Sequence, residues 1–332
     1  MRQNRRNFLN LLVQSEPRAA SYWLHVNRTA MACRFEVTMR QSEEMGIAAA
    51  TEALDEIDRL ESRLTVFRET SEVSVVNSEA AKRSIEVSQE LFDLLTLCQH
   101  LYEETDGAFD VTSGPLTRSW GFLRRQGQLP SQVEIDQAMC VVGSDKLLLD
   151  ETKRTVRFAR EGMEINLGSI GKGYALDSAA DLMSTRVSTA LLNAGSSSMR
   201  AVGNGEHGKG WLVGLRNPRS KLRRLGVLRL RDCALSTSGS EEQFFEHQGQ
   251  RYSHIIDPRS GWPASGVTSV SVVAPTAAIS DALATAFFVG GRQLAEPYCQ
   301  THTNVLAIML ESDGAAPISF GQSSGCDGLQ DL

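Results

Sequence analysis

The sequence predicts an α+β fold of mixed, largely antiparallel sheets packed with helices. Apolar residues recur at three- and four-residue steps in a few long segments, which is typical of amphipathic helices, whereas many short runs read as strands. These elements do not alternate strictly along the chain, which disfavours a doubly wound parallel sheet. We therefore expect a single large domain of two intimately packed halves, with any boundary near residues 125–150.

The expected elements follow from local patterns. Phe35 and Val37 share one face of a first strand over 29–38, and a long helix over 43–67 has an apolar stripe. A second helix over 88–104 stops before Gly107, the residue type common after a helix end. The remaining expected elements are helices at 173–187 and 276–290, and strands at 154–158, 161–167, 189–192, 211–215, 226–230, 233–236, 251–256, 267–273 and 304–310.

The two ends of the chain are expected to lie outside the domain, which spans residues 27–315. Residues 1–26 read as a flexible or amphipathic tail. Its Arg5 and Arg6 resemble the start of a twin-arginine export signal, but Asn10 interrupts an apolar run already shorter than the roughly 7–15 residues that such signals need. Residues 316–332 are expected to be a tail, frayed from Ser319. A cytoplasmic location is favoured, and a periplasmic or membrane-associated one stays open.

Composition narrows the classes of function. The formal charge is −6, from 34 basic and 40 acidic residues, so no basic excess supports general binding to nucleic acid. No stretch approaches the roughly 20 apolar residues of a membrane span. The six cysteines are scattered without a C-x-x-C pair, which indicates neither a zinc site nor a disulfide framework.

A glycine-rich segment at 166–177 is the most informative. Gly168, Gly171 and Gly173 flank Lys172 ahead of an alanine-rich stretch. Glycines let backbone amides approach a phosphate, and a helix start favours negative charge. The spacing fits neither a Walker loop nor a dinucleotide fingerprint. The segment is either a phosphate site of another class or an ordinary connection between a strand and a helix.

Three further segments contain residues suited to chemistry. Asp110, in a loop rich in glycine and aromatic residues, could accept hydrogen bonds from a heterocycle. His254, before an Asp-Pro turn, is either a general base or a structural histidine. Asp281 and Thr285 lie one helical turn apart, so they could offer two oxygen ligands to Mg²⁺ or form a buried, locally capped pair.

Taken in order, motifs from about Met31 to Gly314 resemble the FAD:protein FMN transferases, the ApbE-type flavin transferases. The motifs are Ser71-Glu-x-Ser-x-x-Asn77, Thr105-Asp-Gly-Ala-Phe-Asp110, Gly114-Pro-Leu, Trp120-Gly-Phe, Leu167-Gly-x-Ile-x-Lys-Gly-Tyr-Ala175, Asn193-Ala-Gly195, Ser236-Thr-Ser-Gly239, Ser253-His-Ile-Ile-Asp-Pro258 and Ala274-Pro-Thr with Asp281-Ala-Leu-Ala-Thr285. Each motif is weak alone, but their shared order is specific.

The resemblance implies an activity and a set of site residues. Such proteins use FAD as substrate and Mg²⁺ as cofactor, join FMN to a Ser or Thr hydroxyl of an acceptor flavoprotein, and release AMP. By motif position, the catalytic residues are His254, as the general base, and Lys172. FAD contacts are expected from Met31, Phe67, Ala108, Phe109, Asp110, Asn166, Lys172 and Ile256, and magnesium ligands from Ser169, Asp281 and Thr285. The acceptor motif Asp-Gly-Ser/Thr-x-Ala-Thr is absent from this chain.

The sequence departs from the family pattern at three places. Asn166 stands where Asp is usual, Ser196 and Ser197 where a Gly-Asp pair is common, and Phe67 where Tyr is frequent. Two carboxylates are thereby lost. Two alternatives stay open. One is an FAD pyrophosphatase that uses the same site and passes FMN to water. The other, motivated by the departures at Asn166 and Ser197, is a non-catalytic FAD-binding protein.

Overall fold

The computed structural model describes residues 22–220, 222–241 and 243–330. The helices are α1 (Gly46–Leu64), α2 (Glu72–Glu79), α3 (Gln89–Glu104), α4 (Gly114–Ser119), α5 (Gln132–Met139), α6 (Gly171–Ser184) and α7 (Ala277–Thr301), with 3₁₀ turns at Phe122–Arg124, Ser144–Lys146 and Glu206–Gly208. The strands are β1 (Trp23–Ala30), β2 (Cys33–Arg40), β3 (Ile85–Glu86), β4 (Leu147–Asp150), β5 (Thr155–Phe158), β6 (Ala190–Ala194), β7 (Ser198–Val202), β8 (Trp211–Arg216), β9 (Arg224–Leu230), β10 (Ala234–Gly239), β11 (Phe244–His247), β12 (Gln250–Ser253), β13 (Val267–Ala274), β14 (Leu306–Glu311) and β15 (Ile318–Gly321).

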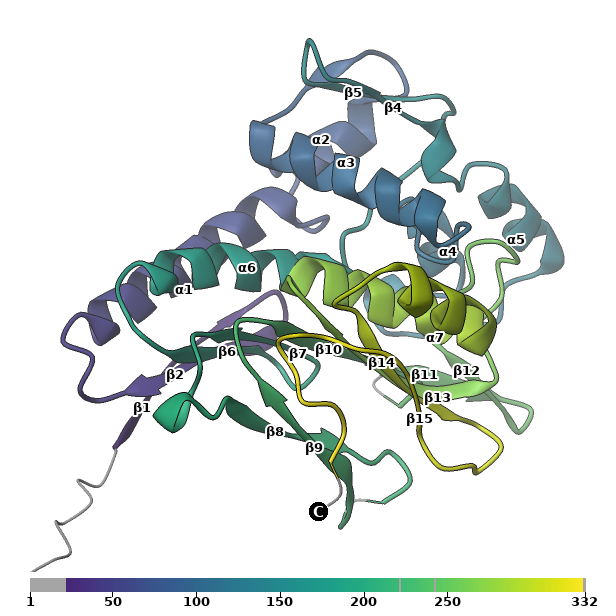
Figure 1. The fold of residues 1–332 in the computed structure, drawn as a ribbon. Coiled ribbons are helices and arrows are strands. Elements are labelled where there is room, and N and C mark those ends of the chain that lie inside the picture. The colour runs from purple at the N-terminus through teal and green to yellow at the C-terminus, as the bar shows by residue number, and fades with distance from the viewer. Residues whose placement is uncertain (1–21, 221, 242, 331–332) are drawn as a thin grey trace, which may run out of the picture.

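A large sheet organises the molecule. Its eight strands run in the order β1-β2-β6-β7-β10-β13-β14-β15, and every neighbouring pair is antiparallel. Helices α1, α6 and α7 cover one face, and the β8–β9 hairpin lies on the other (Figure 1). Helices α2 and α3 and the small sheet β3-β5-β4 stand beyond the helix layer. The predicted α+β class is confirmed.

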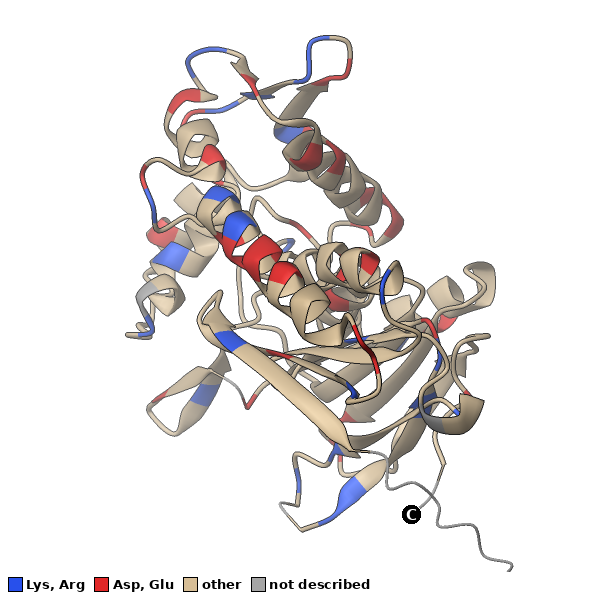
Figure 2. Ribbon diagram, turned by 90° about the vertical axis from the view of Figure 1, so that its left-hand side faces the viewer, with Lys and Arg blue, Asp and Glu red and all other residues tan. Residues whose placement is uncertain are grey.

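The expected helices form where the apolar stripes are, and local caps fix where they begin. Helix α1 buries Leu54, Ile57 and Leu60, and its outer face carries charges of both signs (Figure 2). Helix α7 begins after Thr276, whose hydroxyl accepts a hydrogen bond from the Ile279 amide at 3.3 Å. It continues to Thr301, beyond the predicted end, although Gly291 interrupts the helical backbone with φ 61° and ψ −159°.

The first predicted strand is a hairpin. Residues 23–26, which sequence reasoning assigned to the tail, lie in β1 and pair with β2, and the turn places Met31 and Ala32 at φ 47° and 57°. Strand β1 is an edge strand whose residues are mostly exposed or half-buried. It therefore lacks the apolar alternation that reveals a strand in sequence. Arg5 and Arg6, the residues of the export-signal interpretation, lie outside the described residues.

Two other sequence predictions are wrong. No strand covers 161–167. That segment instead makes isolated backbone hydrogen bonds. For example, the Asn166 amide donates to the Val111 carbonyl oxygen at 2.7 Å. The segment 319–330 is not a frayed tail, because β15 pairs with β14 and Gln330 exchanges backbone hydrogen bonds with Val227. Backbone pairing needs no apolar side chains, so a Gly- and Ser-rich composition conceals it.

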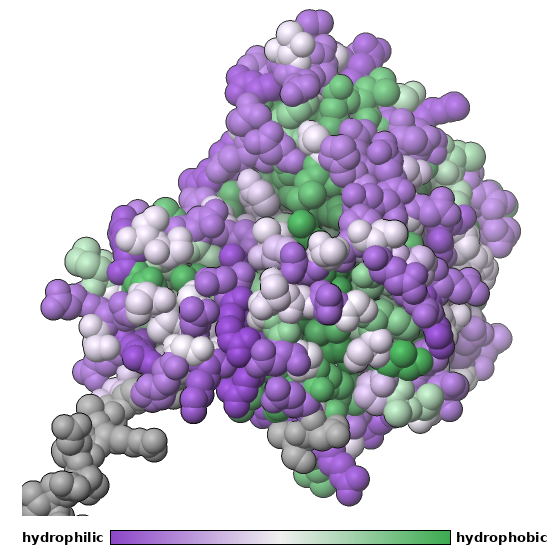
Figure 3. All heavy atoms as spheres, in the orientation of Figure 1, coloured by the Kyte–Doolittle hydropathy of each residue, from purple (hydrophilic) through white to green (hydrophobic). Residues whose placement is uncertain are grey.

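The main core lies between the large sheet and its helices and includes residues from Ala30 to Phe320. A second core, with Val213, Leu228 and Leu235 among its members, fills the space under the β8–β9 hairpin. The surface in Figure 3 is mainly hydrophilic with separate hydrophobic patches. Among the described helices, none has both the length and the apolar character that crossing a membrane requires.

Candidate functional site

A cavity of about 220 Å³ with mixed polar and apolar walls lies where the start of α6, the first half of α7 and the end of β10 meet. The residues around it come from segments far apart in the sequence. Nine residues predicted from the sequence line it: Ala108, Asp110, Asn166, Ser169, Lys172, His254, Ile256, Asp281 and Thr285.

Asp281 and Thr285 lie on α7 at the base of this cavity. The Asp281 side chain is buried, with 6% of the residue exposed. Its two carboxylate oxygens accept hydrogen bonds from the Gly173 amide at 3.2 Å and from Ser198 Oγ at 3.1 Å. Thr285 Oγ1 lies 3.3 Å from Ser238 Oγ, and also 3.3 Å from the carbonyl of Asp281. The pair is therefore fixed in position by α6, β7 and β10 together.

The oxygen atoms here suit a hard cation. Asp281, Thr285 and Ser169 offer only oxygen ligands, the type that Mg²⁺ prefers. Within the described part of the chain, no group of three or more His, Cys, Asp or Glu side chains could hold a metal. Magnesium usually takes one or two carboxylates and completes its shell with water and substrate phosphates. The donors present fit a magnesium ion shared with a bound phosphate.

Lys172 lies on the first turn of α6, beside the carboxylate. Its Nζ donates to Ser197 Oγ at 2.8 Å. The α6 N-terminus and this ammonium group together place positive charge at one end of the cavity, where anionic groups are favoured. Ser197 is uncharged, so the lysine is held by a neutral partner.

Gly173 has a structural explanation. A Cβ atom at this position would lie 2.1 Å from the Ala277 carbonyl oxygen, so only glycine allows α6 to cross the start of α7. Asp177, one turn further along α6, accepts hydrogen bonds from the amides of Ala277 and Ala278, each at 2.8 Å. For Gly173, the ordinary structural interpretation of the glycine-rich segment therefore suffices.

Asp177 is another carboxylate near the cavity, and its pKa is raised. Burial raises the pKa of Asp177 to about 6, although the two amides and Arg200, whose Nε lies 3.4 Å away, oppose the rise. This carboxylate joins α6 to the first turn of α7. The Lys172 helix and the Asp281 helix are consequently connected by this carboxylate as well as by the hydrogen bond between Gly173 and Asp281.

His254 follows β12 and lines the same cavity. Its Nδ1 lies 3.0 Å from the Gln243 carbonyl oxygen. A carbonyl only accepts hydrogen bonds, so Nδ1 carries the proton and Nε2 carries the lone pair in the neutral ring. The Phe122 ring packs edge-on against the imidazole. This geometry gives the histidine the tautomer that a general base requires.

The loop 105–122 contributes unequally. Ala108 and Asp110 line the cavity, whereas Phe109 is 1% exposed and belongs to the main core. One oxygen of Asp110 accepts hydrogen bonds from the amide and hydroxyl of Thr112 and from Ser144 Oγ, at 2.7 to 2.8 Å. Burial raises the pKa of Asp110, and these hydrogen bonds oppose the rise. The Asp110 carboxyl therefore also holds its own loop together.

The other predicted contacts differ in position. Met31 lies in the β1–β2 turn, and Phe67 is 73% exposed just beyond α1; neither lines the cavity. Asn166 does line it, and its Oδ1 accepts a hydrogen bond from the Gly168 amide at 2.9 Å. Sequence reasoning missed Ser198 and Ser238 as partners of the Asp281–Thr285 pair. The motif Ser236-Thr-Ser-Gly239 contains Ser238, whereas Ser198 lies in none of the motifs.

A lysine at a helix start, a carboxylate among hydroxyls and an oriented histidine define an α+β protein with a site for an anionic, phosphate-containing ligand. The chain belongs to the ApbE family, whose sequence model matches residues 31–310.

Named relatives and solved structures agree with this assignment. The FAD:protein FMN transferase of Klebsiella pneumoniae is 32% identical over 244 residues, which cover 73% of this chain and 75% of the relative. The protein of the same name from Treponema pallidum is 29% identical over 306 residues, covering 87% and 84%. The ApbE protein of Thermotoga maritima superposes with a TM-score of 0.83 at 29% identity, covering 90% of this chain and 97% of that one. The apo flavinyl transferase ApbE of Pseudomonas stutzeri gives a TM-score of 0.78 at 25% identity, covering 90% and 95%.

Proposed function

We propose that this enzyme transfers the FMN moiety of FAD to a Ser or Thr hydroxyl of an acceptor flavoprotein, with Mg²⁺, and releases AMP. Family membership and the names of its relatives support the flavin-transferase class. The magnesium requirement and the hydroxyl acceptor are the parts that we add.

One observation carries the proposal. Lys172, His254 and the Asp281–Thr285 pair come from three separate segments, and they line the same cavity. Phosphoryl transfer needs positioning and charge neutralisation more than covalent participation by the protein. A cavity with a cation, a base and oxygen ligands for a metal provides these requirements.

The reaction can be written with the residues at hand. The acceptor hydroxyl oxygen bonds to the phosphorus of the FMN half of FAD, and the bridging P–O bond to AMP breaks. His254 Nε2 takes the hydroxyl proton, and AMP leaves with the bridging oxygen. Lys172 and the α6 amides hold negative charge on the diphosphate. When bound at Asp281 and Thr285, Mg²⁺ adds Lewis-acid stabilisation of the same charge.

The test uses the full chain with FAD, MgCl₂ and a synthetic peptide carrying the acceptor motif. We expect a peptide mass gain equal to FMN, equimolar AMP, and loss of both in Asp281→Ala and in EDTA. Thr276→Ser, which keeps the α7 cap, is the matched control and should retain activity. An unchanged mass gain in Asp281→Ala would remove the metal assignment.

The same assay separates the alternatives. Release of AMP at equal rate with and without peptide, and no peptide mass gain, would identify a pyrophosphatase. FAD that binds and stays uncleaved in the presence of peptide and Mg²⁺ would identify a non-catalytic binding protein.

A further inference from the structure

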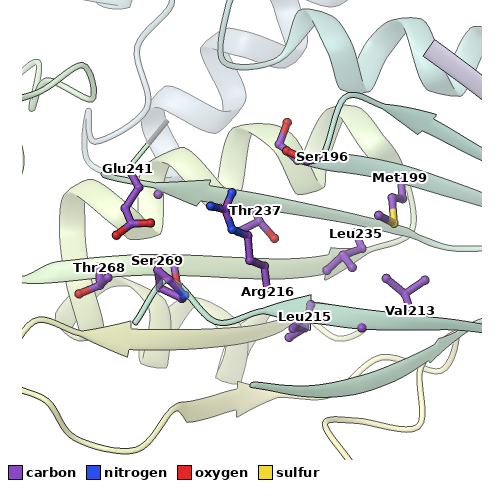
Figure 4. Close-up of a pocket in the computed structure, with 14 residues that line it drawn as sticks. Ser196, Met199, Val213, Leu215, Arg216, Leu235, Thr237, Glu241, Thr268 and Ser269 are labelled. Carbon is purple, nitrogen blue, oxygen red and sulfur yellow. The ribbon is translucent and has the colours of Figure 1, made fainter. Parts of the chain in front are cut away.

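A second cavity lies on the opposite face of the large sheet, under the β8–β9 hairpin. It has a volume of about 100 Å³ and an apolar floor that includes Met199, Val213 and Leu235. Figure 4 shows Arg216 extending from the hairpin toward the end of β10, with Glu241 at the rim.

This hairpin cavity adjoins the site described above. Thr237 and Gly239 of β10 line both cavities. Ser197, which also lines the hairpin cavity, accepts the hydrogen bond from Lys172. The two cavities are therefore separated by little more than the end of one strand, and a chain segment in the hairpin cavity would lie beside the lysine.

The end of β10 has an open edge. Strand β7 pairs with β10 only as far as Ser236, and one further backbone bond joins the Thr237 amide to the Ser197 carbonyl at 2.7 Å. Backbone groups of alternate residues point the same way, so the N–H and C=O of Gly239 point toward the side that β7 has left. Within the described residues, no strand pairs with Gly239 on that side.

Gly239 is not required by its own chain. Its φ is not positive, and an added Cβ would meet the nearest atom, the Thr268 carbonyl oxygen, at an ordinary 3.5 Å. The Cβ would lie on the hairpin side, because the intervening residues Ser236 and Ser238 bond to α7 on the other face. A glycine without a conformational reason in a strand often marks close approach by another backbone.

The charge of the hairpin indicates what kind of segment approaches Gly239. Residues 216–231 contain seven Lys or Arg and no Asp or Glu, so the rest of this chain of net charge −6 carries −13. In the described part of the structure, no carboxylate pairs with Arg216 or Arg223, whereas Arg231 pairs with Asp327 at 2.7 Å.

We propose that the hairpin cavity and the open edge of β10 bind an extended, acidic segment of the acceptor protein and guide its hydroxyl past Gly239 to the FMN phosphate. The proposal rests on the proposed function. The segment adds a short strand beside Gly239, the mode by which extended peptides often bind sheet edges. Arg216 and Arg223 select for acidic flanking residues by electrostatic complementarity.

The experiment measures two quantities on each variant: FAD affinity by fluorescence quenching, and the KM for two acceptor-motif peptides. One peptide has Glu on both flanks of the motif, and the other has Gln at those positions. We expect the wild type to show a KM about tenfold lower for the Glu peptide, and Arg216→Glu with Arg223→Glu to abolish or reverse this preference. Ser196→Trp, at the exposed rim, should raise both KM values about tenfold by occupying the groove. FAD affinity should stay unchanged in all variants.

Arg160→Glu, an exposed charge reversal after β5 at the far end of the molecule, is the matched control and should behave as the wild type. Unchanged KM values in the Arg216/Arg223 and Ser196 variants, with active transfer, would overturn the docking proposal alone. No transfer by the wild type would overturn the proposed function and the docking proposal with it. A third outcome would also overturn the docking proposal. If the double variant loses binding to phosphatidylglycerol vesicles while its peptide KM is unchanged, the basic hairpin binds a membrane surface.

Discussion

The two faces of the end of β10 differ sharply. On the α7 side, hydroxyls interlock: Ser236 Oγ lies 2.8 Å from Ser280 Oγ, and Ser238 reaches Thr285. On the hairpin side, the strand faces a cavity lined by both Arg216 and Glu241. One face is closed by the protein itself, and the other leaves backbone and charge available.

This difference separates two tasks that one transferase must perform. Holding a diphosphate and a metal in one geometry requires rigid, pre-positioned ligands. Accepting a segment of another protein requires a surface that is incomplete until the partner arrives. The following predictions test whether the two faces are as independent as this division requires.

His254→Ala should produce the largest effect. We expect transfer to slow by about 10²- to 10⁴-fold, because the hydroxyl proton loses its acceptor. The KM for the acceptor peptide should change little, since the histidine is not part of the hairpin cavity. Steady-state kinetics measures both values. A rise in KM with an unchanged kcat would mean that His254 binds the acceptor. The two faces of β10 would then not have separate tasks.

Gly173→Ala should cost more stability than any other single-methyl change near the cavity. The new Cβ meets the Ala277 carbonyl at 2.1 Å, so α6 and α7 must separate, at a cost of about 3 kcal/mol or more. Gly239→Ala is the matched control and should change the unfolding free energy by less than about 1 kcal/mol. Urea unfolding measures both. Equal losses would show that Gly239 is structural and would weaken the docking argument.

Asp177 predicts a dependence of stability on pH. Its pKa is raised from 3.8 to about 6, so the folded state binds the proton more tightly than the unfolded state does. The free energy of unfolding should therefore fall as pH rises from about 4 to 6, by up to about 3 kcal/mol from this group, and level off above. Asp177→Asn should lack this component. Urea unfolding of both proteins between about pH 4 and 8 measures this. If the free energy of unfolding varies with pH in the same way in the two proteins, the prediction is wrong.

Asn166→Asp should have the smallest effect. The carboxylate could still accept the Gly168 hydrogen bond, so the fold should be retained. An added negative charge in the cavity should lower the Mg²⁺ concentration for half-maximal transfer about two- to fivefold, roughly 0.5–1 kcal/mol. Titration of activity with MgCl₂ measures this. Transfer that needs more Mg²⁺ would show that residue 166 does not face the metal.

Local periodicity located α1, α3 and α7 from the sequence. Ordered motifs brought together Lys172, His254 and Asp281, which the structure places around one cavity, while their roles there stay predictions. Sequence reasoning failed where information was not local. The pairing of β15 with β14, the edge strand β1 and the crossing that requires Gly173 depend on neighbours distant in sequence. The serines around Asp281 were missed because a hydroxyl partner has no pattern of its own.

The interruption of α7 at Gly291 divides that helix into two segments with different constraints. The segment before it contains Asp281 and Thr285 at fixed positions, while the segment after it packs Tyr298 against His302 and Glu104. Because the helical hydrogen-bond ladder does not run continuously through the break, evolution could lengthen, shorten or retilt the C-terminal segment without displacing Asp281 and Thr285. Sequence divergence among relatives should accordingly rise abruptly beyond this glycine.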